Sequence, residues 1–191
     1  MQEIPSLLYG IYKLEVERRG FNFRPTEETI NNIKLASNWL TNRKSRSCLA
    51  LMGNVGNGKS TLMHAIKRLI WTLSQEEREG YKHNLEEIRA DDLTEIAKNG
   101  LEFNKWKRVE LLAIDDAGLE PSVIKVWGNE KNPFVDLIYS RYDNQLFTII
   151  TTNLNESEFL DKYGIRISDR FAEMFDQIAF NNKSFRQPKT K

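Results

Sequence analysis

The chain has 191 residues, which suits one domain with a sizeable hydrophobic core. Its hydrophobic content of 40% and charged content of 29% are ordinary for a globular protein, and a net charge of +1 does not by itself indicate a partner. Cys48 is the only cysteine, so an internal disulfide is excluded. No run approaches the roughly 18 apolar residues of a membrane span, and the first residues do not show the apolar h-region of a signal peptide. We therefore expect a cytoplasmic protein with no membrane contact.

The N-terminal part of the chain is expected to be helical. Apolar residues at helical spacing predict an amphipathic helix over 4–19, which Gly20 ends. Such a helix must pack either on the body of the protein or on a partner. An extended segment at 21–25 follows, and Thr26 is expected to cap a second helix because two glutamates come directly after it.

The rest of the chain alternates between strand and helix patterns, which predicts an α/β fold: a parallel sheet with helices on both faces. The predicted strands are 47–52, 85–88, 109–114, 147–151 and 177–180. The predicted helices are 61–73, 92–99, 156–163 and 168–175, together with one that begins at Pro133 and carries Arg141 on its apolar face. Asp92 with Glu95, and Asn155 with Glu158, have the spacing of capping pairs, Gly100 is expected to stop a helix, and 117–132 is expected to be a loop.

The stretch from Gly53 to Ser60 reads Gly-Asn-Val-Gly-Asn-Gly-Lys-Ser and matches the pattern G-x-x-x-x-G-K-[ST] between a predicted strand and a predicted helix. Backbone N–H groups of such a loop surround a phosphate chain at the positive end of the helix. Lys59 can then reach the β- and γ-phosphates, and the Ser60 hydroxyl can bind Mg²⁺. The alternative is an ordinary glycine-rich turn. The predicted nucleotide-binding residues are Gly53, Asn54, Val55, Gly56, Asn57, Gly58, Lys59, Ser60 and Thr61.

Polar residues follow two later predicted strands. Asp115 and Asp116 come directly after 109–114, and Asn153 follows 147–151. Because the carboxyl ends of parallel strands share one edge of a sheet, these side chains are expected to face the same ligand as the loop. Asp115 is expected to hold Mg²⁺ through its waters, and Asp116 to polarise the attacking water. The alternatives are a solvated acidic turn for the two carboxylates and a plain strand-to-helix turn for Asn153.

Taken together, these motifs resemble the DnaC-like helicase loaders and the IstB-type transposition ATPases of the AAA+ class. The resemblance covers roughly residues 21–186. Besides the glycine loop, it is carried by Ile-Asp-Asp-Ala-Gly-Leu-Glu at 114–120, Ile-Tyr-Ser-Arg-Tyr at 138–142, Thr-Ile-Ile-Thr-Thr-Asn-Leu at 148–154, Gly-Ile-Arg-Ile-Ser-Asp-Arg-Phe at 164–171 and Lys-Ser-Phe-Arg at 183–186.

The resemblance implies further roles and a set of ligands. It implies that ATP and Mg²⁺ are the cofactors, that Asn153 is the sensor 1 residue, and that Arg170 is an arginine finger acting on a neighbouring subunit. Arg166 is a second candidate for the finger, and Arg186 is a candidate for sensing nucleotide in its own chain. The alternatives are solvated arginines in 166–170 and a frayed basic tail. The implied domains are an N-terminal helix at 1–20, an AAA+ ATPase core at 21–186 without a helical lid, and a disordered basic tail at 187–191.

The function implied is a slow, partner-stimulated ATPase that acts in DNA replication. Its implied partners are ATP and ADP, a replicative helicase, single-stranded DNA, and further copies of the chain in a nucleotide-dependent homo-oligomer. Because only residues 1–20 precede the core, the helix at 4–19 is the candidate contact with a helicase. Asp116 stands where most AAA+ proteins have Glu, as is often the case in the DnaC-like group. Two alternatives stay open: an IstB-like transposition helper, and a nucleotide-gated binding module with negligible hydrolysis.

Two basic clusters are candidates for single-strand binding. One consists of Arg43, Lys44 and Arg46, and the other of Lys105, Lys107 and Arg108 beside Phe103 and Trp106. Basic residues next to aromatic ones suit nucleic-acid backbones and bases, although a solvated surface has the same composition.

Overall fold

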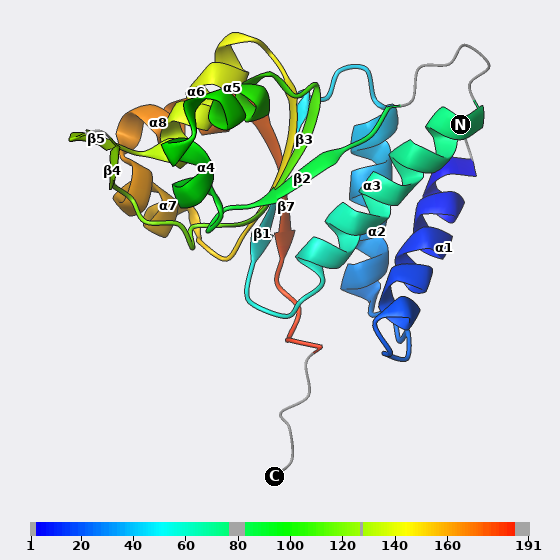
Figure 1. The fold of residues 1–191 in the computed structure, drawn as a ribbon. Coiled ribbons are helices and arrows are strands. Elements are labelled where there is room, and N and C mark those ends of the chain that lie inside the picture. Colours follow the sequence, from blue (N-terminus) through cyan, green and yellow to red (C-terminus); the bar gives the residue numbers. More distant parts are fainter. Residues whose placement is uncertain (1–2, 77–82, 127, 186–191) are drawn as a thin grey trace.

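A five-stranded parallel sheet forms the centre of the protein, as the computed structural model shows for residues 3–76, 83–126 and 128–185 (Figure 1). Its order is β2-β3-β6-β1-β7. The strands are β1 (Cys48–Gly53), β2 (Glu86–Arg89), β3 (Leu111–Ala117), β6 (Phe147–Thr152) and β7 (Phe175–Phe180). The predicted parallel sheet is therefore confirmed, and all five strands end at the same edge.

Helices cover both faces of this sheet, as predicted. One layer contains α1 (Glu3–Arg18), α2 (Glu27–Thr41) and α3 (Lys59–Glu76). The other contains α4 (Leu93–Lys98), α5 (Gly100–Arg108), α6 (Pro133–Asp143), α7 (Glu156–Tyr163) and α8 (Ile165–Met174).

The alternation of side chains along the strands produces two hydrophobic cores. In β1, Cys48 and Ala50 belong to the core under α4–α8, whereas Leu49 and Leu51 belong to the core under α1–α3. All four are fully buried, which explains why this strand reads as a continuous apolar run. Cys48 is a small core residue, as its position in an apolar run indicated.

The N-terminal helix packs on the body of its own chain. Leu8, Ile11 and Tyr12 of α1 are buried in the core that α2 and α3 share. Of the two surfaces that the amphipathic pattern allowed, the structure shows the intramolecular one. Among the described residues, no helix is long and apolar enough to cross a membrane.

Most helix ends agree with the capping signals in the sequence. The Thr26 hydroxyl accepts a hydrogen bond from the Thr29 amide, Asn132 caps α6 in the same way, and Asn155 with Glu158 forms a complete capping box. Side-chain caps at these positions satisfy backbone N–H groups that the helix itself cannot pair.

Four local predictions were wrong. The Asp92 side chain makes no capping bond, and Asn99 instead caps a separate helix that Gly100 begins rather than ends. The last helix begins at Ile165, so Ser168 lies inside it and donates to the Gly164 carbonyl. The expected loop at 117–132 contains a short antiparallel hairpin, β4 (Ile124–Val126) with β5 (Asn129–Lys131). Its three-residue strands are too short for a period to be visible in the sequence.

Arg141 is a fully buried cation held by neutral oxygens. Its guanidinium donates to the carbonyls of Trp106, Val109 and Phe147 and to the Thr148 hydroxyl, at 2.7–3.2 Å. Burial lowers the pKa of Arg141 to about 10, so the group stays charged at neutral pH. It thereby joins the end of α5 to the beginning of β6.

Replacing Arg141 should destabilise the whole fold. Arg141→Ala leaves four buried acceptors without a donor and opens a cavity, so we expect the free energy of unfolding to fall by about 3 kcal/mol or more. Urea denaturation followed by circular dichroism measures this. Arg108→Ala, which removes an exposed arginine from the same region, should change stability by less than about 0.5 kcal/mol. Equal stability of the two variants would contradict the role given to Arg141.

Candidate nucleotide-binding site

The glycine loop connects β1 to α3 at the edge where the strands end, and Lys59 is its central side chain. The Lys59 ammonium donates to the carbonyls of Gly53 and Asn54 at 2.6 and 2.7 Å. It also donates to the side-chain oxygens of Asn57 at 3.1 Å and Asn153 at 2.9 Å. One cation therefore links the loop to the end of β6, and Asn153 lies where the sequence placed it.

Asp115 is joined to the same loop through Ser60. The Ser60 hydroxyl donates to Asp115 Oδ1 at 2.8 Å, and the Thr151 hydroxyl donates to the same oxygen at 2.5 Å. Magnesium in phosphate sites binds few protein oxygens and keeps several waters. Adjacent oxygens on Ser60 and Asp115 fit that requirement. No cluster of three or more acidic, His or Cys ligands occurs among the described residues, and this kind of site does not need one.

Asp116 has an unusual backbone conformation. Its φ angle is 57°, at an irregularity in the pairing of β3 with β6, and its amide donates to the Thr151 hydroxyl at 2.9 Å. Its carboxylate lies 3.7 Å from the guanidinium of Arg89 at the end of β2. Burial and the neighbouring Asp115 charge raise the pKa of Asp116, and Arg89 opposes them. Strain and a raised pKa in one carboxylate are typical of functional sites.

Two glycines of the loop are required by close contacts. A Cβ on Gly53, at φ 138°, would lie 2.2 Å from the Phe180 carbonyl oxygen. A Cβ on Gly58, at φ 104°, would lie 2.5 Å from the Tyr12 hydroxyl. The loop is thus enclosed by β7 on one side and α1 on the other.

The segment after β7 also contacts the loop. The Phe185 amide donates to the Gly56 carbonyl at 2.9 Å, and the Asn182 side chain donates to the Asn57 carbonyl at 3.1 Å. The Asn57 side chain in turn donates to the Phe180 carbonyl at 2.8 Å. Arg186 lies outside the described residues, so its expected role stays a prediction.

Arg170 lies at the opposite edge of the sheet. Its guanidinium stacks on Tyr139 and Tyr142, 4.4 and 4.9 Å from the ring centres, and lies 3.4 Å from Asp143. Asp143 ends α6 just before β6 begins, whereas the loop follows the end of β1. A six-residue strand spans roughly 17 Å, so Arg170 is remote from the loop of its own chain.

Arg166 shares a surface cavity with Arg170. The cavity has a volume of about 640 Å³ and is lined by residues of α6 and α8. Arg166 is exposed, whereas Arg170 is half-buried and has its orientation fixed by three contacts. The geometry therefore distinguishes the two arginines, which the sequence alone did not.

Some residues of the site were missed by the sequence analysis. Arg89 contacts Asp116, the Thr151 hydroxyl contacts Asp115 and the Asp116 amide, and Glu120 anchors the turn after the two acids. Glu120 is 1% exposed, accepts from the Gly118 amide at 2.9 Å, and accepts from the Tyr163 hydroxyl. Arg89 directly follows the predicted strand 85–88, so the rule that parallel strands share one edge could have indicated it. Thr151 ends the predicted strand 147–151, so the same rule could have indicated it, whereas Glu120 carries no such signal.

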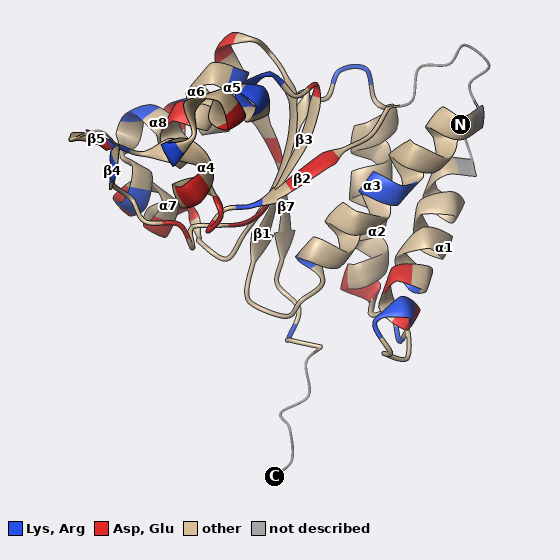
Figure 2. Ribbon diagram, in the orientation of Figure 1, with Lys and Arg blue, Asp and Glu red and all other residues tan. Residues whose placement is uncertain are grey.

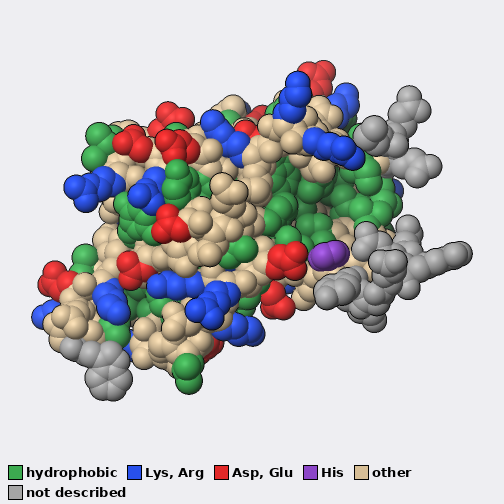
Figure 3. All heavy atoms as spheres, turned by 90° about the horizontal axis from the view of Figure 1, so that it is seen from above, with side chains coloured by type: hydrophobic (Ala, Val, Ile, Leu, Met, Phe, Trp, Pro, Cys, Tyr) green, Lys and Arg blue, Asp and Glu red, His purple; other side chains and the backbone are tan. Residues whose placement is uncertain are grey.

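The two basic clusters lie away from the loop, at the edge where the strands begin. Arg43, Lys44 and Arg46 precede β1, and the last turn of α5, just before β3, carries the other cluster (Figure 2). Seen from that side, basic side chains form separate groups with acidic and apolar ones between them (Figure 3). Phe103 is buried, and the Arg46 guanidinium donates to the Phe175 carbonyl at 2.7 Å. Both side chains therefore already have contacts within the fold.

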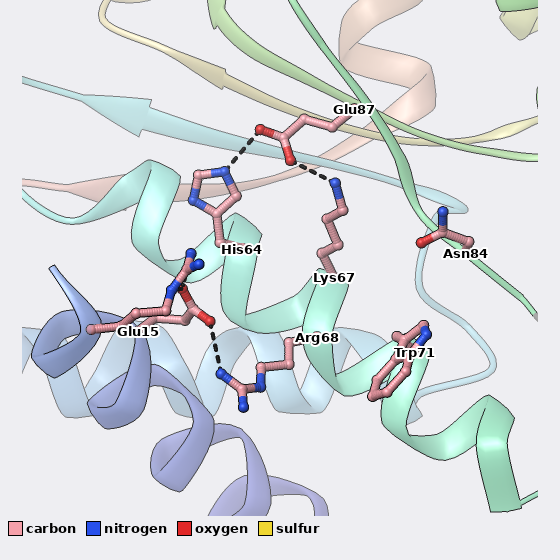
Figure 4. A pocket seen from close by; sticks show the side chains of 8 residues that line it. Glu15, His64, Lys67, Arg68, Trp71, Asn84 and Glu87 are labelled. Atoms are coloured by element: carbon pink, nitrogen blue, oxygen red, sulfur yellow. Dashed lines mark hydrogen bonds and ion pairs between the residues drawn. The ribbon is translucent and has the colours of Figure 1, made fainter.

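A second cavity lies between α1, α3 and the beginning of β2 (Figure 4). It has a volume of about 420 Å³ and is lined mainly by paired charges. Hydrogen bonds from His64 and Lys67, both at 2.8 Å, lower the pKa of Glu87 to about 2 despite its partial burial. His64 therefore has a structural contact here, and His83 contributes its carbonyl to the Ser74 hydroxyl.

A glycine loop between β1 and α3, with acids at the end of β3, which β6 separates from β1, defines a P-loop nucleotide-binding protein. A family model described as an AAA domain matches residues 38–165, and the chain belongs to this family. No curated protein matches the sequence.

Similar solved structures have the same fold. A crystal structure of DnaI is 18% identical, with a TM-score of 0.62 over 83% of this chain and 88% of that one. A DnaC helicase loader is 18% identical, with a TM-score of 0.63 over 83% and 94%. AMPPCP-bound DnaA from Aquifex aeolicus is 20% identical, with a TM-score of 0.55 over 85% of this chain and 50% of that one. The fold is therefore that of the DnaC-like AAA+ proteins.

The raised pKa of Asp116 predicts that replacing this residue stabilises the folded protein, and that the stabilisation depends on pH. A carboxyl group whose pKa is raised by folding destabilises the protein once it ionises, and costs nothing at pH values where it is protonated. Asp116→Asn should therefore raise the melting temperature of the nucleotide-free protein at pH 7.5, and this gain should disappear as the pH falls below about 4. Asn also tolerates the positive φ angle.

Thermal unfolding at several pH values measures the effect. Asp91→Asn is a control, because this exposed carboxylate is paired with Arg89 rather than buried beside another acid. A loss of stability in Asp116→Asn at pH 7.5 would show that the Asp116 charge is stabilised rather than opposed by its surroundings.

Proposed function

We propose that this protein binds and hydrolyses ATP and acts in DNA replication as a DnaC-like helicase loader, through a nucleotide-dependent homo-oligomer. The observation that carries the proposal is the junction of Lys59 with Asn153 and of Ser60 with Asp115. It brings the loop, the expected metal ligands and the expected sensor together at one sheet edge, which is where nucleotides bind to open α/β sheets.

In this proposal each residue has a distinct task. Lys59 exchanges its carbonyl contacts for the β- and γ-phosphates, and Ser60 with Asp115 holds magnesium. When bound, magnesium would neutralise charge on the phosphates. Asn153 orients Lys59 and the γ-phosphate, and Asp116 accepts the proton of the attacking water. The raised pKa of Asp116 makes it a stronger base than an ordinary aspartate.

Arg170 is proposed to complete the site of a neighbouring copy. Its distance from its own loop, its half-exposed position and its fixed orientation support a role between subunits. A guanidinium stabilises the charge of the transferring phosphoryl group by about 10³–10⁵ in rate in related enzymes. An isolated monomer is then a slow ATPase.

The role in replication is supported by the folds of DnaI and DnaC, the second of which is a helicase loader. A replicative helicase is accordingly the proposed protein partner. Single-stranded DNA is the proposed nucleic-acid partner, because one DnaA structure of the same fold contains it. With Phe103 buried, contact at the α5 cluster would be mainly to phosphates and would weaken steeply with salt.

A nucleotide-gated binding module is the second candidate, favoured by the contact of Asp116 with Arg89, which competes for the proposed base. Size-exclusion chromatography with ATP separates the two candidates. The binding module would be favoured if Lys59→Ala loses ATP-dependent assembly while Asp116→Asn keeps it. The wild-type protein would in that case show no measurable ATP turnover. A transposition helper would share the same site and differ only in its partners.

Mixing two inactive variants tests the composite site. Lys59→Ala keeps the finger but lacks the loop lysine, and Arg170→Ala keeps the loop but lacks the finger. Each alone should lose phosphate release by about 10³-fold or to background, whereas the mixture should recover part of the wild-type rate because some interfaces combine both intact halves.

Wild-type specific activity should also rise with protein concentration, and Arg166→Ala is the matched control from the same helix. Phosphate release that is linear in enzyme concentration and unchanged by Arg170→Ala would overturn the intersubunit mechanism.

A further inference from the structure

We propose that Arg19, at the end of α1, is a further nucleotide-binding residue that contacts the α-phosphate and ribose end of the ligand. The inference rests on the proposed nucleotide site and adds a residue from outside its motifs. Its starting point is a hydrogen bond of 3.2 Å from the Arg19 guanidinium to the hydroxyl of Thr61, which directly follows Ser60 in the first turn of α3.

The backbone of Arg19 is fixed by the end of α1. Gly20 has a φ angle of 79°, and the amides of Arg19, Gly20 and Phe21 all donate back to carbonyls of the last turns of the helix. A glycine in this conformation ends a helix without strain. The C-terminal end of a helix also favours a cation. Arg19 is therefore held beside the loop by local structure.

The Arg19 side chain is oriented by a second contact. Its guanidinium lies 2.6 Å from His64 Nδ1, and His64 Nε2 lies 2.8 Å from Glu87. Because a guanidinium can only donate, Nδ1 accepts and Nε2–H donates to Glu87, which fixes a neutral imidazole. Figure 4 shows the His64–Glu87 part of this arrangement beside α1.

The charge of Arg19 is held by neutral acceptors. Within residues 3–76, 83–126 and 128–185, no ion pair includes Arg19, whereas its neighbour Arg18 is paired with Glu15. The Arg19 charge also acts on the loop side of α1, since it partly offsets the burial that raises the pKa of Tyr12 to about 12. Tyr12 is the residue that faces Gly58.

The direction of the triphosphate follows from the placement of these residues. Asp115 and Asn153 come from β3 and β6, so the γ-phosphate end must point toward that side of β1. Arg19 directly follows α1 and contacts Thr61, the residue after Ser60, rather than the side chains that face Asp115 and Asn153. Because the backbone of such a loop surrounds the α- and β-phosphates while its lysine reaches the β- and γ-phosphates, the part of the ligand nearest Thr61 is the α-phosphate with its ribose, which ATP and ADP share.

Nucleotide affinities of matched variants test this inference. We would titrate the full chain with ADP and with AMPPCP, each with magnesium, and compare wild type, Arg19→Ala and Arg18→Ala. Arg19→Ala should weaken both ligands by about tenfold or more with an unchanged ratio between them, since it removes one charge-assisted contact to a shared phosphate. Arg18→Ala should change either affinity by less than about twofold.

The outcomes separate this inference from the proposed function. Failure of the wild type to bind either nucleotide would overturn the proposed site itself. If the wild type binds nucleotide and Arg19→Ala binds it with the same affinity, only the role of Arg19 would be overturned. The same holds if Arg19→Ala loses affinity for AMPPCP but not for ADP. If Arg19→Ala does not fold, Arg19→Gln keeps the length of the side chain without the charge and answers the question in the same titration.

Discussion

The ammonium group of Lys59 is the interaction on which the site depends. It is 4% exposed and satisfies two loop carbonyls and two asparagine side chains, so it fixes the loop relative to β6. A buried ammonium is stable only with such a set of acceptors. Because these acceptors carry no net charge, the Lys59 ammonium can exchange some of them for an anionic phosphate at little electrostatic cost. The contacts that order the loop thus also prepare it for its ligand.

Much of this arrangement could be predicted from the sequence, because the signals were local. The Gly53–Ser60 pattern, the apolar strands and the capping residues Thr26, Asn132 and Asn155 each depend on a few neighbouring residues. The edge rule for parallel sheets then placed Asp115 and Asn153 beside Lys59.

The remaining features depend on contacts between distant segments. The edge rule places Thr151 and Asp115 at the same sheet edge but does not indicate their hydrogen bond, and the bond from Arg19 to Thr61 has no sequence signal, because each bond joins elements that only the fold brings together. The positive φ angle of Asp116 likewise accompanies an irregularity in strand pairing. Tertiary context decided these cases over local propensity. The separation of α4 from α5 is different, because Asn99 caps α5 through its own neighbours Leu101 and Glu102, a local signal that competed with the acidic pair at Asp92.

The separation of Arg170 from its own loop has a consequence for stoichiometry. In the proposed intersubunit mechanism, the surface that supplies Arg170 and the surface that receives it are different, so a repeated contact between copies would be head to tail. An open row of copies then always has one loop without a neighbour's arginine and one arginine without a loop. Only a closed ring makes every position equivalent, and turnover per subunit in an open row would grow with its length.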